Sequence, residues 1–188
     1  HLVIRRQRQM CIRDRMNEHA AIKRYEQGWL TNISRDIDES IDLMVDAAQR
    51  RVPISIGHIG NIVELWERII ERNIHVDLGS DQTSLHNPYQ GGYFPADYSY
   101  QESSLMMSND PEKFAQEIRK TLIRHADAVN TLSGRGMFFW DYGNAFLLEA
   151  SRVGADVLKP NGNFRYPSYV EDIMGPICFD YGFGPYRW

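Results

Sequence analysis

The densest group of polar side chains in this sequence lies over residues 81–86, which read DQTSLH. A carboxylate, an amide, two hydroxyls and an imidazole fall within six positions, directly after a predicted strand. Such groups can hydrogen-bond the hydroxyls of a sugar or the amide of a ring, and His86 could serve as a general acid or base. A turn that caps its own backbone has the same composition, so the residues alone leave both interpretations open.

A glycine motif, GHIGN over residues 57–61, lies between a predicted strand and a predicted helix. Its glycines permit a close approach to the backbone, and the N-terminus of the helix offers N–H groups to a phosphate. A tight turn that needs glycine explains the motif at least as well. The GRG at residues 134–136 precedes a strand and lacks a third glycine, so it fails the context of a dinucleotide fingerprint.

Histidine and cysteine residues show no metal-ligand spacing, so no metal site is predicted. His75 at the start of a strand and His125 within a helix are interpreted as structural. The two cysteines, Cys11 and Cys178, do not form a disulfide framework, and a reducing cytoplasm is therefore the expected location.

Strands and helices must alternate along the chain to position these residues. The predicted elements are helices over 16–29 and 36–51, a strand over 52–57, a helix over 62–72, a strand over 75–78, a long loop over 82–100, helices over 99–107 and 110–132, a strand over 136–140, a helix over 145–153 and a short helix near 170–174. This order predicts an α/β fold: a partial Rossmann-like parallel sheet with crossover helices. Ligands of such sheets bind beyond the carboxyl ends of the strands, where the loops 57–61, 79–93 and 141–144 are expected to meet.

The charge of the chain is unevenly distributed. The 188 residues suit one domain. Residues 1–15 hold five arginines and one acid, so their net charge is +4. Because the whole chain has a net charge of −4, residues 16–188 carry a net charge of −8. An acidic body argues against nucleic acid as a partner, and no apolar run approaches the length of a membrane span. Residues 1–15 are predicted to be a non-native Arg-rich segment, so that the domain proper covers residues 16–188.

Several longer motifs carry a resemblance to a known family. The stretches SIGHIGN (55–61), DLGSDQTSLHNPYQGGYFPA (77–96), RGMFFWDYGNAFLLEASRVGADV (135–157), FRYPSYVEDIMGP (164–176) and FDYGFGPYRW (179–188) together resemble the urocanase (urocanate hydratase) family. The resemblance covers residues 16–188 and implies the later part of a central NAD-binding domain. It also implies a homodimeric, cytoplasmic lyase of histidine degradation, which adds water to urocanate to give imidazolonepropionate and uses tightly bound NAD as an electrophile.

The resemblance implies particular site residues. The expected NAD contacts are Asn61, Ile62, Gln82, Thr83, Ser84, Leu85, His86, Tyr93, Phe94 and Tyr142. These residues lie in the three loops that the element pattern indicates. Arg187, in GPYRW, is expected to receive the carboxylate of urocanate, because a guanidinium presents a planar fork to such a group.

The sequence also departs from the family. The glycine-rich phosphate loop of the family would lie upstream of this sequence, and Arg15 stands where an acid would bind the ribose. The region of the catalytic-site cysteine would lie downstream, and Cys178 is not that cysteine because it precedes GPYRW. No catalytic residue is therefore assigned, and the chain alone is expected to be inactive and to bind NAD weakly. The alternative is a stand-alone nucleotide-binding or interaction module, whereas the incomplete fingerprint disfavours a conventional NAD dehydrogenase.

Overall fold

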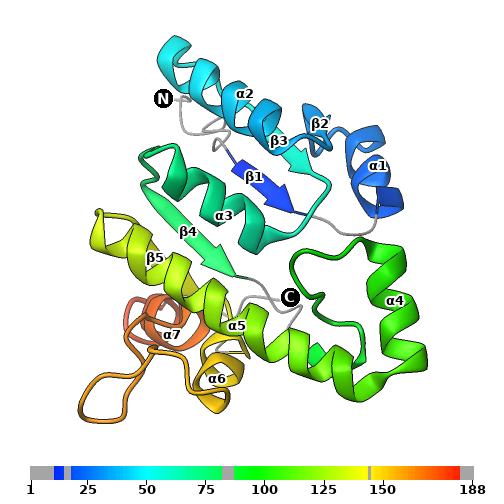
Figure 1. Cartoon of the computed structure of the whole chain (residues 1–188). Coiled ribbons are helices and arrows are strands. Elements are labelled where there is room, and N and C mark those ends of the chain that lie inside the picture. The colour runs from blue at the N-terminus through cyan, green and yellow to red at the C-terminus, as the bar shows by residue number, and fades with distance from the viewer. Residues whose placement is uncertain (1–10, 15–17, 82–86, 144, 183–188) are drawn as a thin grey trace.

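The computed structural model describes residues 11–14, 18–81, 87–143 and 145–182 (Figure 1). Two short parallel sheets are formed within these ranges. The first has the order β1-β3-β2, from β1 (Cys11–Asp14), β3 (Ser55–His58) and β2 (Asn32–Ser34). The second pairs β4 (Leu78–Asp81) with β5 (Phe138–Asp141), so that Asp81 lies opposite Asp141. The prediction of parallel strands joined by helices is confirmed.

Helices make up most of the remaining structure. They are α1 (Glu18–Glu26), α2 (Ile37–Arg50), α3 (Ile62–Glu71), the 3-10 turn η3 (Pro88–Gln90), α4 (Tyr100–Asn109), α5 (Pro111–Gly134), α6 (Ala145–Arg152), the π-helix η4 (Tyr169–Met174) and α7 (Gly175–Phe179). In Figure 1, α3 lies between β1 and β4, and the long helix α5 packs against α3, α4 and α6.

Side-chain caps explain where several helices begin. Asp36 accepts a hydrogen bond from the backbone of Glu39 at the start of α2. Ser99 and Glu102 form a reciprocal capping box on α4. Asp110 caps α5, whose first residue is Pro111. These are the cap residues that helix N-termini prefer, because they satisfy N–H groups that lack an intrahelical acceptor.

The core lies between α3, α5, α6 and the inner face of the second sheet. Its most deeply buried large side chains include Phe114, Ile118, Leu122, Phe139, Phe146 and Leu147. The opposite face of this sheet is open, since the register partners Leu78 and Phe138 are 54% and 51% exposed. Side chains alternate between the two faces of a strand, so the same register buries Asp81 and Asp141.

The observed strands differ from the predicted ones in position and number. β4 begins at Leu78 and not at residue 75, because Asn73 takes a positive φ of 51° and Ile74 still donates to the carbonyl of Ile69 at the end of α3. β1, β2 and α7 were not predicted. β1 lies within the Arg-rich segment and pairs with β3.

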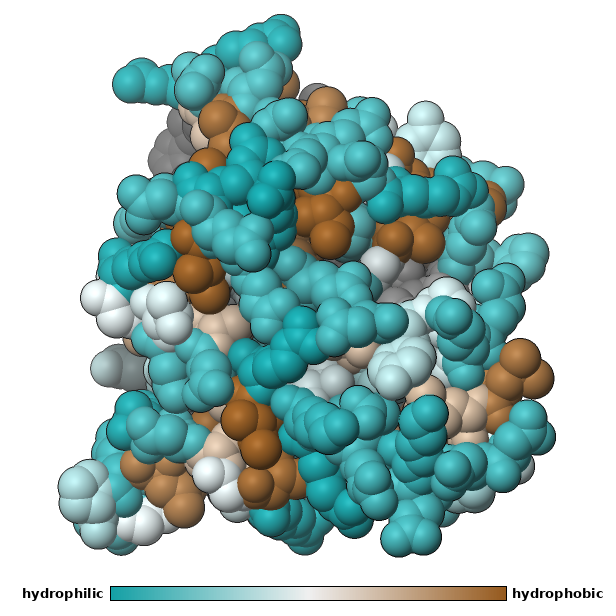
Figure 2. All heavy atoms as spheres, viewed as in Figure 1, coloured by the Kyte–Doolittle hydropathy of each residue, from teal (hydrophilic) through white to brown (hydrophobic). Residues whose placement is uncertain are grey.

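Hydrophilic residues cover most of the face shown in Figure 2, with separate hydrophobic patches between them. None of the helices in the described part of the chain has the length and apolar character needed to span a lipid bilayer.

Candidate functional site

Among the residues that the structure describes, four strands end in buried polar side chains: Ser34 ends β2, and the other three strands lead into the loops that the sequence indicates. His58 at the end of β3 and Asp141 at the end of β5 are each 1% exposed, and Asp81 at the end of β4 is 8% exposed. The carboxyl ends of parallel strands are where α/β folds bind ligands. The structure therefore places buried polar groups at the carboxyl ends of strands in both sheets, as the element pattern predicts for ligand binding.

The loop between β3 and α3 is closed by Asn61. Its side-chain oxygen accepts a hydrogen bond from Val63 N (2.9 Å), and its amide donates to the carbonyl of Phe94 (3.0 Å). With 4% of the residue exposed, the side chain of Asn61 serves the fold. What this loop offers a ligand is the backbone at the first turn of α3.

His58 is held in one tautomer beneath this loop. Its Nδ1 lies 3.1 Å from Ser40 Oγ, and the single hydroxyl proton of Ser40 goes to the carbonyl of Asp36 (2.9 Å). Nδ1 therefore carries the proton and donates to Ser40, which leaves Nε2 as an unprotonated acceptor facing Gly60. Burial lowers the pKa of His58, and the negative charge of Asp36 raises it by a smaller amount. The net effect lowers the pKa, so the imidazole is neutral at pH 7.

Replacing Gly60 by alanine is expected to destabilise the chain by about 1–3 kcal/mol through overpacking. A Cβ at this position would lie 2.3 Å from His58 Nε2, and the ring cannot withdraw because Ser40 holds its other nitrogen. The measurement is the free energy of unfolding from urea titration of the chain.

Two further variants separate this clash from a general effect of the added methyl group. Gly134→Ala is the matched control, since a Cβ there meets nothing within 4 Å. In a His58→Ala background, Gly60→Ala should cost little, and an undiminished cost in that background would contradict the clash.

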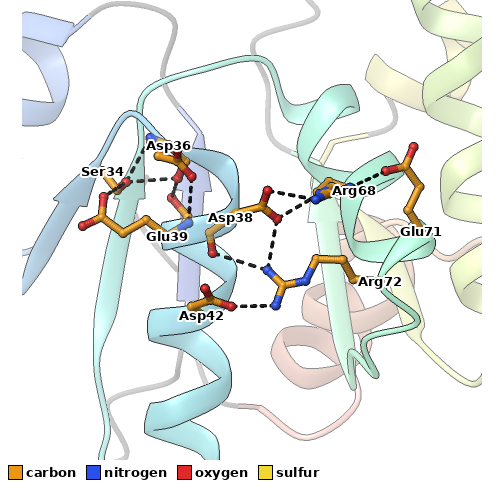
Figure 3. Close-up of polar contacts among 9 residues, drawn as sticks. Ser34, Asp36, Asp38, Glu39, Asp42, Arg68, Glu71 and Arg72 are labelled. Carbon is orange, nitrogen blue, oxygen red and sulfur yellow. Dashed lines mark hydrogen bonds and ion pairs between the residues drawn. The ribbon is translucent and has the colours of Figure 1, made fainter.

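An ion-pair cluster joins the two helices that flank β3 in the chain (Figure 3). Arg68 of α3 makes a bidentate contact with Asp38 of α2, with both N–O distances at 2.9 Å. Arg72 bonds to Asp42 at 2.6 Å and to Asp38 at 3.1 Å. The hydrogen bond from Arg68 holds the pKa of Asp38 below its ordinary value. The cluster ties α3, and with it the loop before α3, to α2.

The segment that carries Tyr93 and Phe94 is fastened to α3 and α5. Besides the bond from Asn61 to Phe94, Ala96 N donates to Thr121 Oγ1 (3.0 Å). Asp97 N donates to Glu64 (2.7 Å), while Arg124 bonds to Glu67 (2.7 and 2.8 Å) and to Asp97 (2.5 Å). These contacts hold this part of the long loop against the helices, so it forms a fixed wall of the site.

His125 links this wall to the end of β4. Its Nδ1 lies 3.0 Å from Tyr93 Oη, and its Nε2 lies 3.9 Å from Asp81 Oδ2. Complete burial lowers the pKa of His125 to about 3, so the ring is neutral at pH 7. If the Tyr93 hydroxyl donates its proton to Nδ1, then Nδ1 is the acceptor nitrogen of the neutral ring. The proton of the imidazole is then on Nε2, which faces the Asp81 carboxylate.

Asp141 organises the end of β5. Its carboxylate accepts hydrogen bonds from Leu147 N (2.9 Å) and Gly143 N (3.3 Å), which fixes the entry to α6. Burial raises the pKa of Asp141, and the backbone N–H groups oppose that rise. Tyr142 N donates to the carbonyl of Asp81 (3.0 Å), so the Tyr142 loop is joined to the end of β4.

The structure brings several of the predicted site residues together. Asn61 and Phe94 are hydrogen-bonded, Ile62 begins α3, and Tyr142 lies beside the end of β4. Residues Gln82, Thr83, Ser84, Leu85, His86 and Arg187 lie outside the described residues. The predictions for all of these residues as ligand contacts remain predictions.

Sequence reasoning missed the part that His58, Ser40 and His125 take in the site. The burial of His125 agrees with its interpretation as a structural residue, but the sequence does not indicate its partner, because only the path of the loop from Asn87 onward places Tyr93 against it. Within the described ranges, no group of three or more histidine, cysteine and acidic residues could hold a metal ion.

These observations define an α/β domain with parallel strands whose carboxyl ends carry buried polar groups. A family model described as the urocanase Rossmann-like domain matches residues 4–173, so the match begins inside the Arg-rich segment. The chain belongs to the urocanase family.

Curated relatives agree with this assignment. The chain is 49% identical over 183 residues to a probable urocanate hydratase of Dictyostelium discoideum, covering 95% of this chain and 27% of that protein. It is 47% identical to the urocanate hydratase of Mus musculus, over 92% of this chain and 27% of that protein. A probable urocanate hydratase of Caenorhabditis elegans is also 47% identical, over 92% of this chain and 26% of that protein. The chain thus spans about a quarter of the length of these relatives.

Proposed function

We propose that this chain is the nucleotide-binding part of a urocanate hydratase and that its ligand is NAD. The observation that carries the proposal is that the ends of β4 and β5 lie side by side, with Asp81 opposite Asp141, in a chain that matches a urocanase Rossmann-like domain. The Tyr93–Phe94 segment links the loop after β3 to these ends, since Phe94 bonds to Asn61 and Tyr93 contacts His125, whose Nε2 lies 3.9 Å from Asp81.

The residues at this edge suit a dinucleotide. The first turn of α3 offers backbone N–H groups for a phosphate, and Asn61 keeps that turn in shape. Tyr142 presents a partly exposed ring at the end of β5, and the sequence that follows Asp81, over residues 82–86, contains hydroxyl, amide and imidazole groups. When bound, NAD would supply an electrophilic ring to the reaction, while the residues of this chain bind and orient it.

The activity of the whole protein is part of the same proposal. We propose that the full-length, homodimeric form hydrates urocanate to imidazolonepropionate in the cytoplasm, with Arg187 receiving the substrate carboxylate. The relatives are named urocanate hydratases and extend well beyond the matched region. We expect the 188-residue chain alone to be inactive, because no residue in it is assigned a catalytic part.

The test is a calorimetric titration of the chain with NAD, alongside an absorbance assay for urocanate consumption. We expect weak, saturable binding and no turnover. Asn61→Asp should weaken binding at least tenfold, since it places a negative charge where the phosphates approach and removes the donor to Phe94.

Asn73→Asp is the matched control, because Asn73 is exposed and lies at the far end of α3. Binding that is absent at millimolar NAD would contradict the NAD proposal and favour the interaction module. Turnover of urocanate by the chain would contradict the expected inactivity.

A further inference from the structure

Two tyrosine rings stack beside the end of β5. The rings of Tyr142 and Tyr169 lie with their centroids 5.0 Å apart and their planes 12° from parallel. Both residues are partly exposed. Tyr142 follows the last residue of β5, whereas Tyr169 is the first residue of η4 and comes from a segment 27 positions further along the chain.

The backbone around Tyr169 is built onto the end of the strand. Asp141 N donates to the carbonyl of Pro167 (3.0 Å), and Asp141 and Ser168 form a parallel bridge. Ser168 is 2% exposed; its N–H donates to Asp172 (2.7 Å), and its hydroxyl accepts from Glu171 N (3.3 Å). Tyr169 is therefore held in place by the backbone before it and by the first turn of η4 after it.

The helix that begins at Tyr169 is of an unusual type. η4 is a π-helix of six residues. Such turns are rare and occur frequently at functional sites, since the wider turn changes the direction of the side chains that it carries. Here the wider turn begins at the residue whose ring stacks on Tyr142.

The pair lies at the ligand edge of the second sheet. Tyr142 N bonds to the carbonyl of Asp81, the residue directly before residues 82–86. We infer that Tyr142 and Tyr169 form one aromatic platform on which a planar nitrogen heteroaromatic ring of the ligand stacks, with Tyr169 as a binding residue of this site. The inference rests on the proposed function for the choice of ligands.

Stacking suits this chemistry. A tyrosine face attracts a flat ring by dispersion and by its quadrupole, and an offset stack adds to the area that is buried. Aromatic platforms of this kind bind different heterocycles because every such ring has a π-face. A base of the dinucleotide and the imidazole of urocanate share this chemistry, and the experiment separates them.

The experiment records proton NMR spectra of AMP, nicotinamide mononucleotide, NAD and urocanate, each titrated with the 188-residue chain. Ring protons of the ligand that lies on the platform should shift upfield and show NOEs to the ring protons of Tyr169. Tyr169→Leu should weaken the binding of that ligand about tenfold and remove the shifts. Tyr169→Phe, which keeps the ring, should bind within about twofold of the parent chain.

Tyr25→Leu is the matched control, since it removes a half-exposed tyrosine from α1, outside the strand-end loops. The inference is overturned if Tyr169→Leu binds as the parent does, if Tyr25→Leu loses as much affinity, or if no ligand shows upfield shifts. The NOEs in the parent chain decide the question even where Tyr169→Leu fails to fold.

The outcomes also separate the inference from the proposed function. NAD that binds while none of the four ligands shows upfield shifts would overturn the platform and leave the nucleotide proposal standing. Shifts with urocanate and none with the nucleotides would support the platform as a urocanate subsite, and the calorimetric titration would decide separately whether NAD binds.

Discussion

Replacing Phe146 by alanine is expected to lower the free energy of unfolding by about 3–5 kcal/mol. Phe146 is fully buried in α6, where its ring lies 4.5 Å from His125 and 5.8 Å from Phe139 between centroids. The substitution removes the transfer free energy of the ring and leaves a cavity among side chains that can collapse only in part. Because small domains are stable by about 5–15 kcal/mol, a large share of the stability should be lost.

Leu148→Ala is the matched control for this prediction. Leu148 lies two residues away in the same helix but is 41% exposed, so its truncation should change stability by less than about 1 kcal/mol. The measurement is urea unfolding followed by circular dichroism. Equal losses for the two variants would show that the core does not lie where the structure places it.

The position of Phe146 also ties the core to the site. One end of α6 is fixed by Asp141 at the strand end, and the ring of Phe146 supports His125, which holds Tyr93. A loss of packing at Phe146 should therefore loosen both the Tyr142 loop and the Tyr93 segment.

The alternation of elements was sufficient to predict parallel strands joined by helices, and with them the strand ends that form the candidate site. The helix that begins at Ile62 and the strand that ends in Asp141 follow from local signals: an asparagine cap in one case, an apolar run before a polar turn in the other. The carboxyl ends of the strands of one parallel sheet lie on one side of it, so the pairing of the ends of β4 and β5 needs no knowledge of side-chain packing, whereas β3 lies in the other sheet.

The contacts within the site could not be predicted in the same way. Asn61 has the same local sequence whether its amide meets a ligand or the carbonyl of Phe94, and 33 residues separate the two. His125 shows no local sign of its partner, since the path of the loop decides that Tyr93 reaches it. The sequence places Tyr169 only in a family motif, because the bridge from Ser168 to Asp141, which brings Tyr169 beside Tyr142, joins segments that are distant in the chain.

The start of β4 shows a competition between local signals. Residues 75–78 have the apolar pattern of a strand, yet the end of α3 reaches Ile74 by a backbone bond to Ile69. The strand then begins at Leu78, where it can pair with Phe138, and it ends on Asp81 instead of three residues earlier. This shift brings Asp81 within reach of His125.

Acid is expected to destabilise the chain well above the range in which carboxylates titrate, chiefly through His125. Complete burial lowers the pKa of this imidazole from 6.5 to about 3, whereas the unfolded chain keeps the ordinary value. Above pH 6.5 both states are neutral and the full stability is present. Below it the unfolded state takes up a proton that the folded state refuses, so stability falls with pH until the folded pKa is reached.

The expected slope follows from this linkage. For one such histidine, the free energy of unfolding falls by about 1.4 kcal/mol per pH unit below 6.5, or about 2 kcal/mol between pH 6.5 and 5. His58 adds to the loss in the same direction, since burial also lowers its pKa. The measurement is urea unfolding at half-unit steps from pH 7.5 to 5.

His125→Phe isolates the contribution of His125. This variant should be less stable at every pH, because the Tyr93 hydroxyl loses its buried acceptor, but its pH slope should be flatter than that of the parent chain. His75→Gln removes an imidazole that is 67% exposed, and its slope should match the parent. A His125→Phe chain that keeps the full slope would contradict the prediction, because His125 would then take up a proton as readily in the folded state as in the unfolded chain.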